Sequence, residues 1–497
     1  MNENSYLICG GTVVCADRLL RDHDVVIVDG RIVAIQPTEV GGALSELPRE
    51  TDAISGVWEG MVPDGTAGML PVVDARGAYV TPGLIDVHSD YVENVASPRP
   101  SVVMDLSTSL YKADRELVSH GITTIFHSLS VYGASIFDHK PIRDFSNVSA
   151  LIDHVASMRA SEERDHLIRH RLHMRVELDS VDLYDDIEAY LRSGKVDLVS
   201  FMDHTPGQGQ YSDLLIFADT LKGYRDLSDE EVARIIKNQQ EANKLTYAQV
   251  ATLAGIARER GISIASHDDD SVEKLELMDG LEAAISEFPI TLNIAREARR
   301  RGLHTLAGAP NVLMGHSHSG NLSAREAVQD GAIDMLCSDY YPAALLDAVF
   351  MLRDACDLSL EKAFSLVTIN PAKAAGIAGE VGSIAVGKRA DVLLVREIAC
   401  DGAGRTMPVV TRAFVGGHSV FRSHYPDQPR GYGRDRREAQ IVAEAGARRQ
   451  AANRARSSAP ASATATATVP TGTHADGLVA TSTTASAVCD AQQAEVR

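Results

Sequence analysis

Short apolar runs alternate with helix-length amphipathic segments over residues 83 to 375. Each run has the length of a buried strand, and the segments between runs repeat their apolar residues with a helical period. The runs are GLIDVH (83–88), ITTIFH (122–127), RLHMRVEL (171–178), VDLVSFMDH (196–204), ISIASH (262–267), PITLNI (289–294), NVLMG (311–315) and MLCSD (335–339). This alternation predicts an α/β fold, a (β/α)₈ TIM-like barrel over residues 81–380. A doubly wound open sheet is the alternative, but no Gly-x-Gly-x-x-Gly follows the first run, which weakens a dinucleotide-binding interpretation.

The two flanks of this region have a strand pattern instead. In residues 1–80, the stretch VVIVDGRIVAI carries Asp-Gly between two β-branched runs, which is typical of a hairpin. Residues 36–73 are rich in Gly, Pro and acids, so we expect a loop insertion there. Residues 381–427 contain strand runs again, GSIAVGKRADVLLV and TRAFVGGHSVFRS. We expect the two flanks to pair into one small β domain built from both ends of the chain.

Charge and composition narrow the function classes. The formal net charge of −20 argues against nonspecific nucleic-acid binding, which needs a basic face. A local cluster of cations can still hold a small anionic ligand. No apolar stretch approaches the length of a membrane span, and six scattered cysteines without a Cys-x-x-Cys pair indicate reduced thiols in a cytoplasmic protein. We therefore expect no nucleic acid and no membrane as partners; the oligomeric state, a homo-oligomer included, stays open.

The last segment, residues 428–497, has a composition of its own. Residues 430–456 carry eight arginines against three acids, and an Ala/Thr/Ser-rich stretch of low complexity follows. Such a stretch has too little apolar bulk to offset the entropy of ordering, so we expect a disordered tail. The basic part could bind RNA or an acidic partner, but a solvated linker with a short helix is the favoured interpretation.

Imidazoles and carboxylates stand at the ends of five of the eight runs. In a barrel these ends share one face, where active sites lie. The candidate metal ligands are His88, Asp90, Glu177, His204, His267 and Asp339. Mixed imidazole and carboxylate ligands suit Zn²⁺, Mn²⁺ or Fe²⁺, and six of them suggest two divalent metal ions that activate a bridging water. Each residue alone has a structural interpretation, which we favour for His127 and His173, but the whole constellation favours a metal site.

The third run shows which way its side chains point. Leu172, Met174, Val176 and Leu178 alternate with the polar set His173, Arg175 and Glu177. The apolar set suits the helix layer, and the ionisable set would face the barrel interior. Because ionisable groups are costly there unless they are paired or bound to metal, the polar set supports the metal hypothesis.

Several residues are candidates for binding an anionic substrate. MDHTPGQGQY (202–211) is a polar loop after a strand end, and GHSHSGNLSARE (315–326) precedes a helical segment. Ser323 and Glu326 fit a capping box, so this helix start is either simply well capped or also an anion site. The candidate substrate-binding residues are Arg99, Arg175, Gln208, His318, Asn321 and Arg325.

These motifs resemble a known family. PGLIDVHSD, the strand-end ligands and VGSIAVGKRADVLLV resemble the amidohydrolase superfamily. The resemblance implies a metal-dependent hydrolase barrel with a β-sandwich domain built from both ends of the chain. HSDYVENVASPRP, SFMDHTPGQGQY, ASHDDD and the segment 308–350 are similar, more narrowly, to the diphosphatases that act on α-D-ribose 1-methylphosphonate 5-triphosphate in the carbon–phosphorus lyase pathway. Most of the superfamily has His-x-His where this chain and those diphosphatases have His88-x-Asp90.

The narrower resemblance implies release of pyrophosphate from the 5-triphosphate, which leaves a 5-phosphate. It implies that Glu177 bridges the two metals and that Asp339 is the catalytic residue that orients or deprotonates the water. The substrate would be a small anionic phosphorylated sugar. His127 and His316 depart from the expected pattern. The alternatives are an amidohydrolase acting on a C–N bond, such as a deacetylase or cyclic amidase, and a non-catalytic scaffold on the same fold.

Overall fold

The computed structural model describes residues 4–38, 56–61, 67–131, 141–161, 165–211, 213–224, 227–315, 322–400 and 405–425. These residues belong to one compact unit of the chain, residues 1–436. The predicted disordered tail, residues 428–497, lies outside the described residues. The described strands form two sheets, one of eight strands and one of nine.

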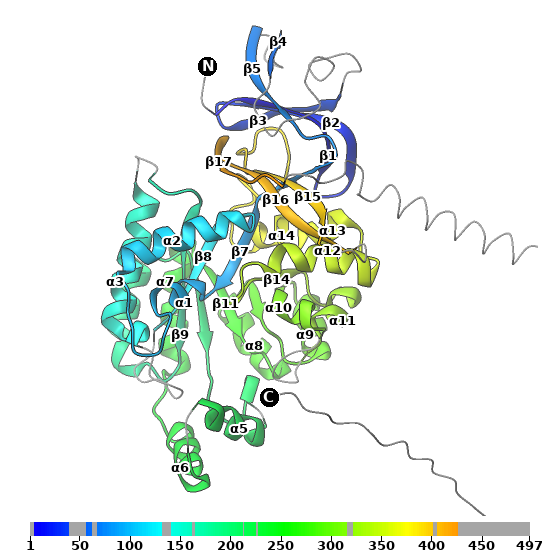
Figure 1. Cartoon of the computed structure of the whole chain (residues 1–497). Coiled ribbons are helices and arrows are strands. Elements are labelled where there is room, and N and C mark those ends of the chain that lie inside the picture. Colours follow the sequence, from blue (N-terminus) through cyan, green and yellow to red (C-terminus); the bar gives the residue numbers. More distant parts are fainter. Residues whose placement is uncertain are drawn as a thin grey trace, which may run out of the picture. The chain divides into compact units, whose positions relative to one another are not determined.

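The eight-stranded sheet is the predicted barrel, drawn in Figure 1. Its strands are β7 (Leu84–Ser89), β8 (Ile122–Val131), β9 (Arg169–Glu177), β10 (Leu198–Met202), β11 (Ser263–His267), β12 (Ile285–Glu287), β13 (His304–Gly308) and β14 (Met335–Cys337). They pair in parallel and in chain order. The last strand meets the first through a bridge between Ser89 and Asp339, with Asp339 N–H donating to the His88 carbonyl at 3.1 Å. This contact closes the barrel.

Helices follow the strands and lie outside the barrel (Figure 1). They are α1 (Tyr91–Ala96), α2 (Leu106–Ser119), α3 (Phe145–Ala160), α4 (Tyr184–Ser193), α5 (Leu214–Tyr224), α6 (Asp229–Gln240), α7 (Tyr247–Glu259), α8 (Val272–Gly280), α9 (Leu292–Arg300), α10 (Ala309–Met314), α11 (Ala324–Asp330), α12 (Ala344–Cys356), α13 (Leu360–Ser365) and α14 (Ile369–Ala374). As the sequence predicts, Ser323 caps α11, and its hydroxyl accepts a hydrogen bond from Glu326 N–H. Among the described helices, none is both long and apolar enough to cross a membrane.

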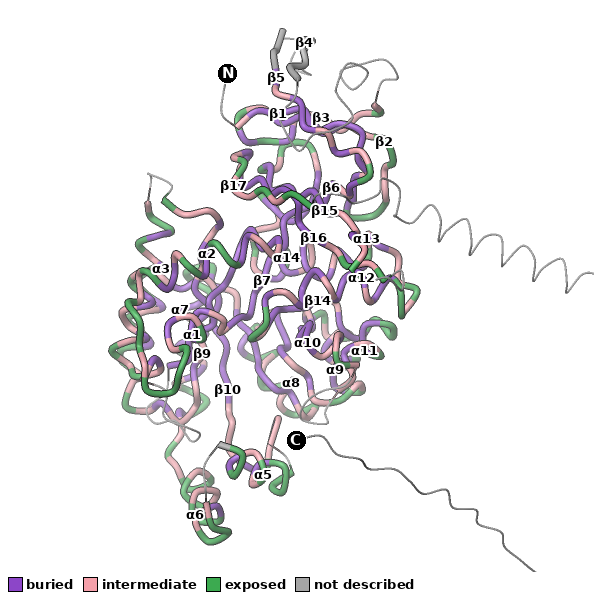
Figure 2. The backbone as a smooth tube through the Cα atoms, in the orientation of Figure 1, coloured by how far each residue is buried: buried purple, intermediate pink, exposed green. Residues whose placement is uncertain are grey.

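Side chains of the barrel strands alternate between two cores, and Figure 2 shows the buried strands at the centre. Leu172, Met174 and Val176 pack in the outer core with residues of α3 and α7, as predicted. The inner core contains Phe126 from β8 and Leu198 from β10, among others. The polar set of β9 therefore faces the interior.

Two of the eight predicted strands are wrong. Residues 289–294 are not a strand: Thr291 caps α9 by accepting from Ile294 N–H, and the sixth strand is the shorter β12 just before them. Residues 311–315 lie in and just after α10, where Pro310 stands in the first turn, and the seventh strand is β13. The observed strands β12 and β13 are only three to five residues long and contain few large apolar residues. The segments that follow them are more apolar, and for this reason the sequence pattern predicts the strands there.

The nine-stranded sheet joins both ends of the chain, as predicted. Its strands are β1 (Tyr6–Val14), β2 (Leu19–Val28), β3 (Arg31–Pro37), β4 (Gly56–Met61), β5 (Ala67–Asp74), β6 (Tyr79–Pro82), β15 (Val392–Ala399), β16 (Thr406–Val415) and β17 (His418–Arg422). The strand β6 pairs with β1 on one side and with β15 on the other. Asp29 and Gly30 form the predicted β2–β3 turn with φ of 48° and 76°, the left-handed values that a two-residue hairpin turn requires.

The sheet curls around a core of its own, because residues near its two ends share one cluster. Ile32 of β3 and Phe414 of β16 both belong to that cluster, and the ring centroids of Tyr6 and Phe414 are 5.1 Å apart. One prediction for this domain needs correction: residues 36–73 are not only a loop, since β4 and β5 pair there as an antiparallel hairpin. The Gly and Pro content that suggested a loop belongs partly to this hairpin, because its two strands contain Gly56, Gly60, Gly68 and Pro71.

Candidate metal centre

A β-bulge in β7 directs His88 into the barrel. The pairing of β7 with β8 shifts register between Asp86 and Ser89, so that Val87 lies in the inner core and His88 also faces the interior. Its Nδ1 atom lies 3.3 Å from Oε1 of Glu287 at the end of β12, and both side chains are buried. Bulges commonly re-aim side chains beside active sites.

His173 of β9 lies next to this pair but has partners at both ring nitrogens. Its Nδ1 is 3.1 Å from the Val87 carbonyl, and its Nε2 is 2.9 Å from Oγ of Ser200. The three residues His88, His173 and Glu287 have ligand-type atoms within 4.8 Å of one another. Because His173 is already engaged, His88 and Glu287 are the better ligands of this first group, and the contacts support the structural interpretation of His173.

A second group forms beside the first from residues at or just after the ends of β10 and β11. His204, His267 and Asp268 again have ligand-type atoms within 4.8 Å of one another. Oδ2 of Asp268 lies 3.2 Å from Nδ1 of His267 and 3.5 Å from Nε2 of His204. Nδ1 of His204 contacts Oε1 of Glu177 at the end of β9. The ring centroids of His88 and His267 are 5.5 Å apart, so the two groups adjoin.

The remaining predicted ligands lie at the barrel seam. Asp90 follows β7, and its Oδ2 is 3.5 Å from a guanidinium nitrogen of Arg143. Asp339 follows β14, and its carbonyl accepts from Asp90 N–H at 3.0 Å. Of the predicted ligands, His88 belongs to the first group, and His204 and His267 belong to the second. Glu177 contacts His204, whereas Asp90 and Asp339 are members of neither group.

Burial and neighbouring charges shift several pKa values here. Burial, with Arg175 and His267 nearby, lowers the pKa of His88 well below its usual range. Burial, with Asp90 nearby, raises the pKa of Asp339 to about 7. Burial opposes a charge on His204 as well, but the carboxylates of Glu177 and Asp268 raise its pKa to about 10. The centre therefore packs ionisable groups whose charges need an additional partner.

Unsatisfied atoms indicate what that partner is. Among the described residues, buried atoms without a hydrogen-bond partner include His88 Nδ1, Asp90 Oδ1, His267 Nδ1, Asp268 Oδ2 and both carboxylate oxygens of Glu287. Leaving such atoms unpaired costs free energy, and most buried polar groups avoid it. These atoms are the imidazole nitrogens and carboxylate oxygens that bind divalent transition metals. The residues present fit metal ions.

Backbone strain is concentrated at the same strand ends. Asp268, Phe288 and Asp339 have φ values of 53°, 54° and 58°, in the left-handed region that residues other than glycine rarely adopt. They follow β11, β12 and β14 within one or two residues. Such strain persists where the surrounding structure over-determines it, which is common at functional sites.

The candidate substrate-binding residues are not all at the centre. Arg175 lies at the centre, where its Nη2 atom is 3.4 Å from Nε2 of His267. Arg99 is exposed in the loop after α1, and Gln208 hydrogen-bonds Asp203. Arg325 donates to the carbonyls of α10 at Val312 and Leu313, so its guanidinium is already used. His316, His318 and Asn321 lie outside the described residues.

His127 points away from this centre. It lies 2.8 Å from Nδ1 of His170, whose Nε2 is 3.1 Å from Oδ1 of Asp114 on α2. All three side chains are buried. This network supports the structural interpretation of His127.

Sequence reasoning missed two residues of the centre. Glu287 is the last residue of β12, and the sequence pattern predicts this strand a few residues too late in the chain. Asp268 belongs to the run HDDD directly after β11. An acidic run immediately after a strand end in a barrel was the available signal for Asp268.

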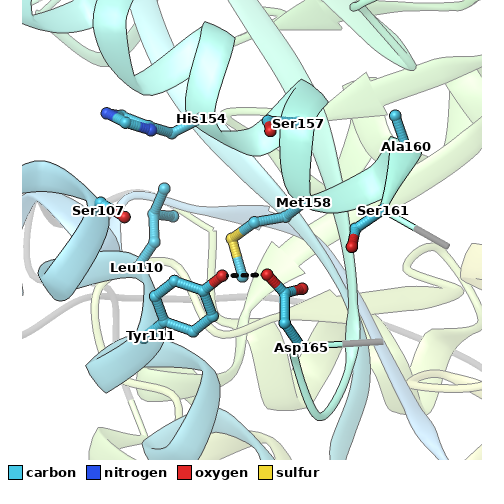
Figure 3. Close-up of a pocket in the computed structure, with 9 residues that line it drawn as sticks. All are labelled: Ser107, Leu110, Tyr111, His154, Ser157, Met158, Ala160, Ser161 and Asp165. Carbon is cyan, nitrogen blue, oxygen red and sulfur yellow. Dashed lines mark hydrogen bonds between the residues drawn. The ribbon is translucent and has the colours of Figure 1, made fainter. Parts of the chain in front are cut away.

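A hollow of about 340 Å³ between α2 and α3 is a separate feature (Figure 3). It is lined by Ser107, Leu110, Tyr111, His154, Ser157, Met158, Ala160, Ser161 and Asp165. The Tyr111 hydroxyl lies 2.5 Å from Oδ2 of Asp165. Its lining holds a carboxylate and no Arg or Lys, so the hollow does not suit a highly charged anion.

Sequence comparison identifies the family to which this barrel and its candidate metal centre belong. The pattern of the Amidohydrolase family matches residues 218–420. A relative from Escherichia coli (strain K12), alpha-D-ribose 1-methylphosphonate 5-triphosphate diphosphatase, is 34% identical over 330 residues, which cover 65% of this chain and 84% of the relative. The chain therefore belongs to the amidohydrolase family and is a hydrolase of that superfamily.

Two further comparisons are more distant. Imidazolonepropionase from Parabacteroides distasonis is 29% identical over 199 residues, 36% of this chain and 47% of the relative. Among solved structures, a D-hydantoinase superposes with a TM-score of 0.53 and 13% identity, covering 86% of this chain and 100% of that chain. This last likeness shows the fold alone and supports a barrel with an attached β domain.

Proposed function

We propose that this protein hydrolyses the 5-triphosphate of α-D-ribose 1-methylphosphonate, or a close analogue, to the 5-phosphate and pyrophosphate. The observation that carries the proposal is the Escherichia coli diphosphatase, which is 34% identical and covered over 84% of its length. The clustered imidazoles and carboxylates, with Arg175 beside them, support hydrolysis of a phosphorylated substrate. The reaction would contribute to phosphonate catabolism.

The centre would hold two divalent metal ions. His88 and Glu287 would bind one ion, and His204, His267 and Asp268 would bind the other. Asp90, Glu177 and Asp339 remain proposed ligands, and the contact of Glu177 with His204 supports its proposed role. Bound divalent ions would supply Lewis-acid polarisation of a phosphoryl oxygen and a lowered pKa for water.

The chain's own residues would position the substrate and move a proton. Arg175 would orient a phosphate, since a guanidinium makes two directed hydrogen bonds to such a group. Asp339, which follows β14 at the barrel seam beside Asp90, would accept the proton of the attacking water as a general base. The water oxygen forms a bond to the α-phosphorus while the bond to the pyrophosphate oxygen breaks.

Product analysis by ³¹P NMR tests this proposal. Incubation with the ribose 5-triphosphate in H₂¹⁸O is expected to give equimolar 5-phosphate and pyrophosphate, with the label only in the 5-phosphate. Release of orthophosphate, or a label only in pyrophosphate, contradicts attack at the α-phosphorus. No turnover by metal-loaded protein contradicts the proposed substrate.

A second candidate is hydrolysis of a C–N bond. The match to an imidazolonepropionase favours it, although that match covers only 47% of the relative. A panel of cyclic amides and N-acetylated sugars separates the two candidates. Turnover of a panel member faster than of the triphosphate would favour the second.

A further inference from the structure

Two buried carboxylates lie two residues away in the chain from proposed metal ligands, Asp86 from His88 and Asp269 from His267. Asp269 and Asp86 are both fully buried. Each is bonded to residues of two different barrel strands or strand ends. Neither is among the proposed ligands. Both oxygens of Asp269 accept hydrogen bonds, whereas Oδ2 of Asp86 has no hydrogen-bond partner among the described residues.

Asp269 connects β11 with β12. Its Oδ1 accepts from the hydroxyl of Ser266, and its Oδ2 accepts from the hydroxyl of Ser286 at 2.5 Å. Ser266 directly precedes His267, and Ser286 directly precedes Glu287. One carboxylate thus fixes the residue before a ligand on each of two neighbouring strands.

Asp86 connects β7 with the end of β14 in the same way. Its Oδ1 accepts from Ser338 N–H at 3.1 Å, and the carboxylate also accepts from His88 N–H. Ser338 directly precedes Asp339, and its hydroxyl lies 2.8 Å from Oγ of Ser89. This is the seam where the barrel closes through few hydrogen bonds.

We propose that Asp86 and Asp269 are positioning residues that set the spacing of the metal ligands by cross-linking adjacent strands at a ligand or one residue before it. The inference rests on the proposed metal centre. His88 and Asp339 are held across the seam by Asp86, and His267 and Glu287 are held across β11 and β12 by Asp269. Groups that orient metal ligands typically contribute about 10- to 100-fold to metal affinity.

A purely structural role of Asp86 and Asp269 and a positioning role predict different effects of substitution on metal affinity. A buried carboxylate is costly to fold, so its replacement by an apolar residue need not lower the stability of the metal-free protein. A positioning role instead predicts that Asp86→Leu and Asp269→Leu lose metal affinity even where thermal stability is kept. The variants Asp86→Asn and Asp269→Asn keep an oxygen acceptor and are expected to restore most of the affinity.

Asp114 is the matched control. It is a buried aspartate that accepts from Leu167 N–H and Ile168 N–H at 2.8 and 2.9 Å, just before β9 begins and away from the ligands. Asp114→Leu removes comparable backbone hydrogen bonds. Its affinity for metal is expected to equal that of the wild type, whatever its effect on stability.

The experiment measures Mn²⁺ binding to folded, chelator-treated protein in competition with a fluorescent chelator, together with kcat and KM. Both Leu variants are expected to bind Mn²⁺ about 10- to 100-fold more weakly, with kcat reduced more than KM changes. Wild-type affinity in both Leu variants overturns the inference, as does an equal loss in Asp114→Leu. If the Leu variants fail to fold, Ser266→Ala, Ser286→Ala and Ser338→Ala replace them, and unchanged Mn²⁺ affinity in all three overturns it.

The test distinguishes this inference from the proposed function. Wild-type protein that binds no Mn²⁺ or Zn²⁺ overturns the metal centre and the inference with it. Wild-type binding without hydrolysis of the triphosphate overturns the proposed substrate but leaves the positioning role supported by the affinity series.

Discussion

The Oε1 atom of Glu287 lies 3.3 Å from Nδ1 of His88, and neither atom has a hydrogen-bond partner. The two residues are almost two hundred positions apart in the chain, and closure of the barrel brings them together. A buried carboxylate with both oxygens unpaired destabilises the metal-free protein. It also provides the charge that a bound cation needs.

Glu287→Gln is therefore expected to change two properties in opposite directions. The metal-free variant should unfold at a higher temperature than the wild type, because a buried charge is removed. Added Mn²⁺ should stabilise the variant much less, since its affinity falls by at least about tenfold. Thermal unfolding with and without Mn²⁺ measures both. Glu282→Gln, at an exposed position, is the control, and an equal Mn²⁺-dependent shift in Glu287→Gln and wild type would contradict the assignment.

Arg175 and Arg171 stand on the same strand, and only Arg175 reaches the centre. Arg175 lies beside His267, whereas Arg171 pairs with Asp197 at 2.8 Å. We expect Arg175→Gln to raise KM for the triphosphate roughly 10- to 100-fold, because a hydrogen bond to a charged group contributes about 1.5–3 kcal/mol. Steady-state kinetics check this, with Arg171→Gln as the control. A raised KM in both variants, or in neither, would remove Arg175 from substrate binding.

Much of this architecture was predictable from the sequence because long strands have strong periodic patterns. Strand β9 shows it best: its alternation predicts both its outer apolar face and its inner polar face. Strand β12 shows the limit, since a strand of three residues has no period to detect, and Glu287 was missed with it. The close contact of Glu177 with His204 depends on the register of β9 against β10, which a single sequence does not encode locally.

Stability against acid is expected to depend on His127 and His170. Burial lowers the pKa of both side chains in the folded protein. Below about pH 6.5 the unfolded chain takes up protons that the folded chain does not, so the free energy of unfolding falls as pH falls. Each histidine contributes up to about 1.4 kcal/mol per pH unit in that range. His127→Gln should make the dependence between pH 6.5 and 5 less steep in urea unfolding, and an unchanged slope would mean that His127 is already protonated when folded.

A buried ion pair joins the barrel and the β domain. Arg353 of α12 donates to both carboxylate oxygens of Glu397 on β15, at 2.8 and 2.9 Å, and the two side chains are 7% and 9% exposed. Removing Glu397 leaves the buried guanidinium with Asp354 as a remaining carboxylate partner, so the cost is expected to be smaller than the about 3–5 kcal/mol of a fully unpaired buried charge. Glu397→Gln is therefore expected to lower the free energy of unfolding by about 1.5–3 kcal/mol in guanidinium denaturation. Glu188→Gln, which breaks an exposed helical pair with Arg192, should cost no more than about 0.5 kcal/mol. If Arg353→Met restores the free energy of unfolding of the Glu397→Leu variant, the loss of stability comes from the charge of Arg353 without Glu397. If the double variant is as unstable as Glu397→Gln, the ion pair itself holds the two domains together.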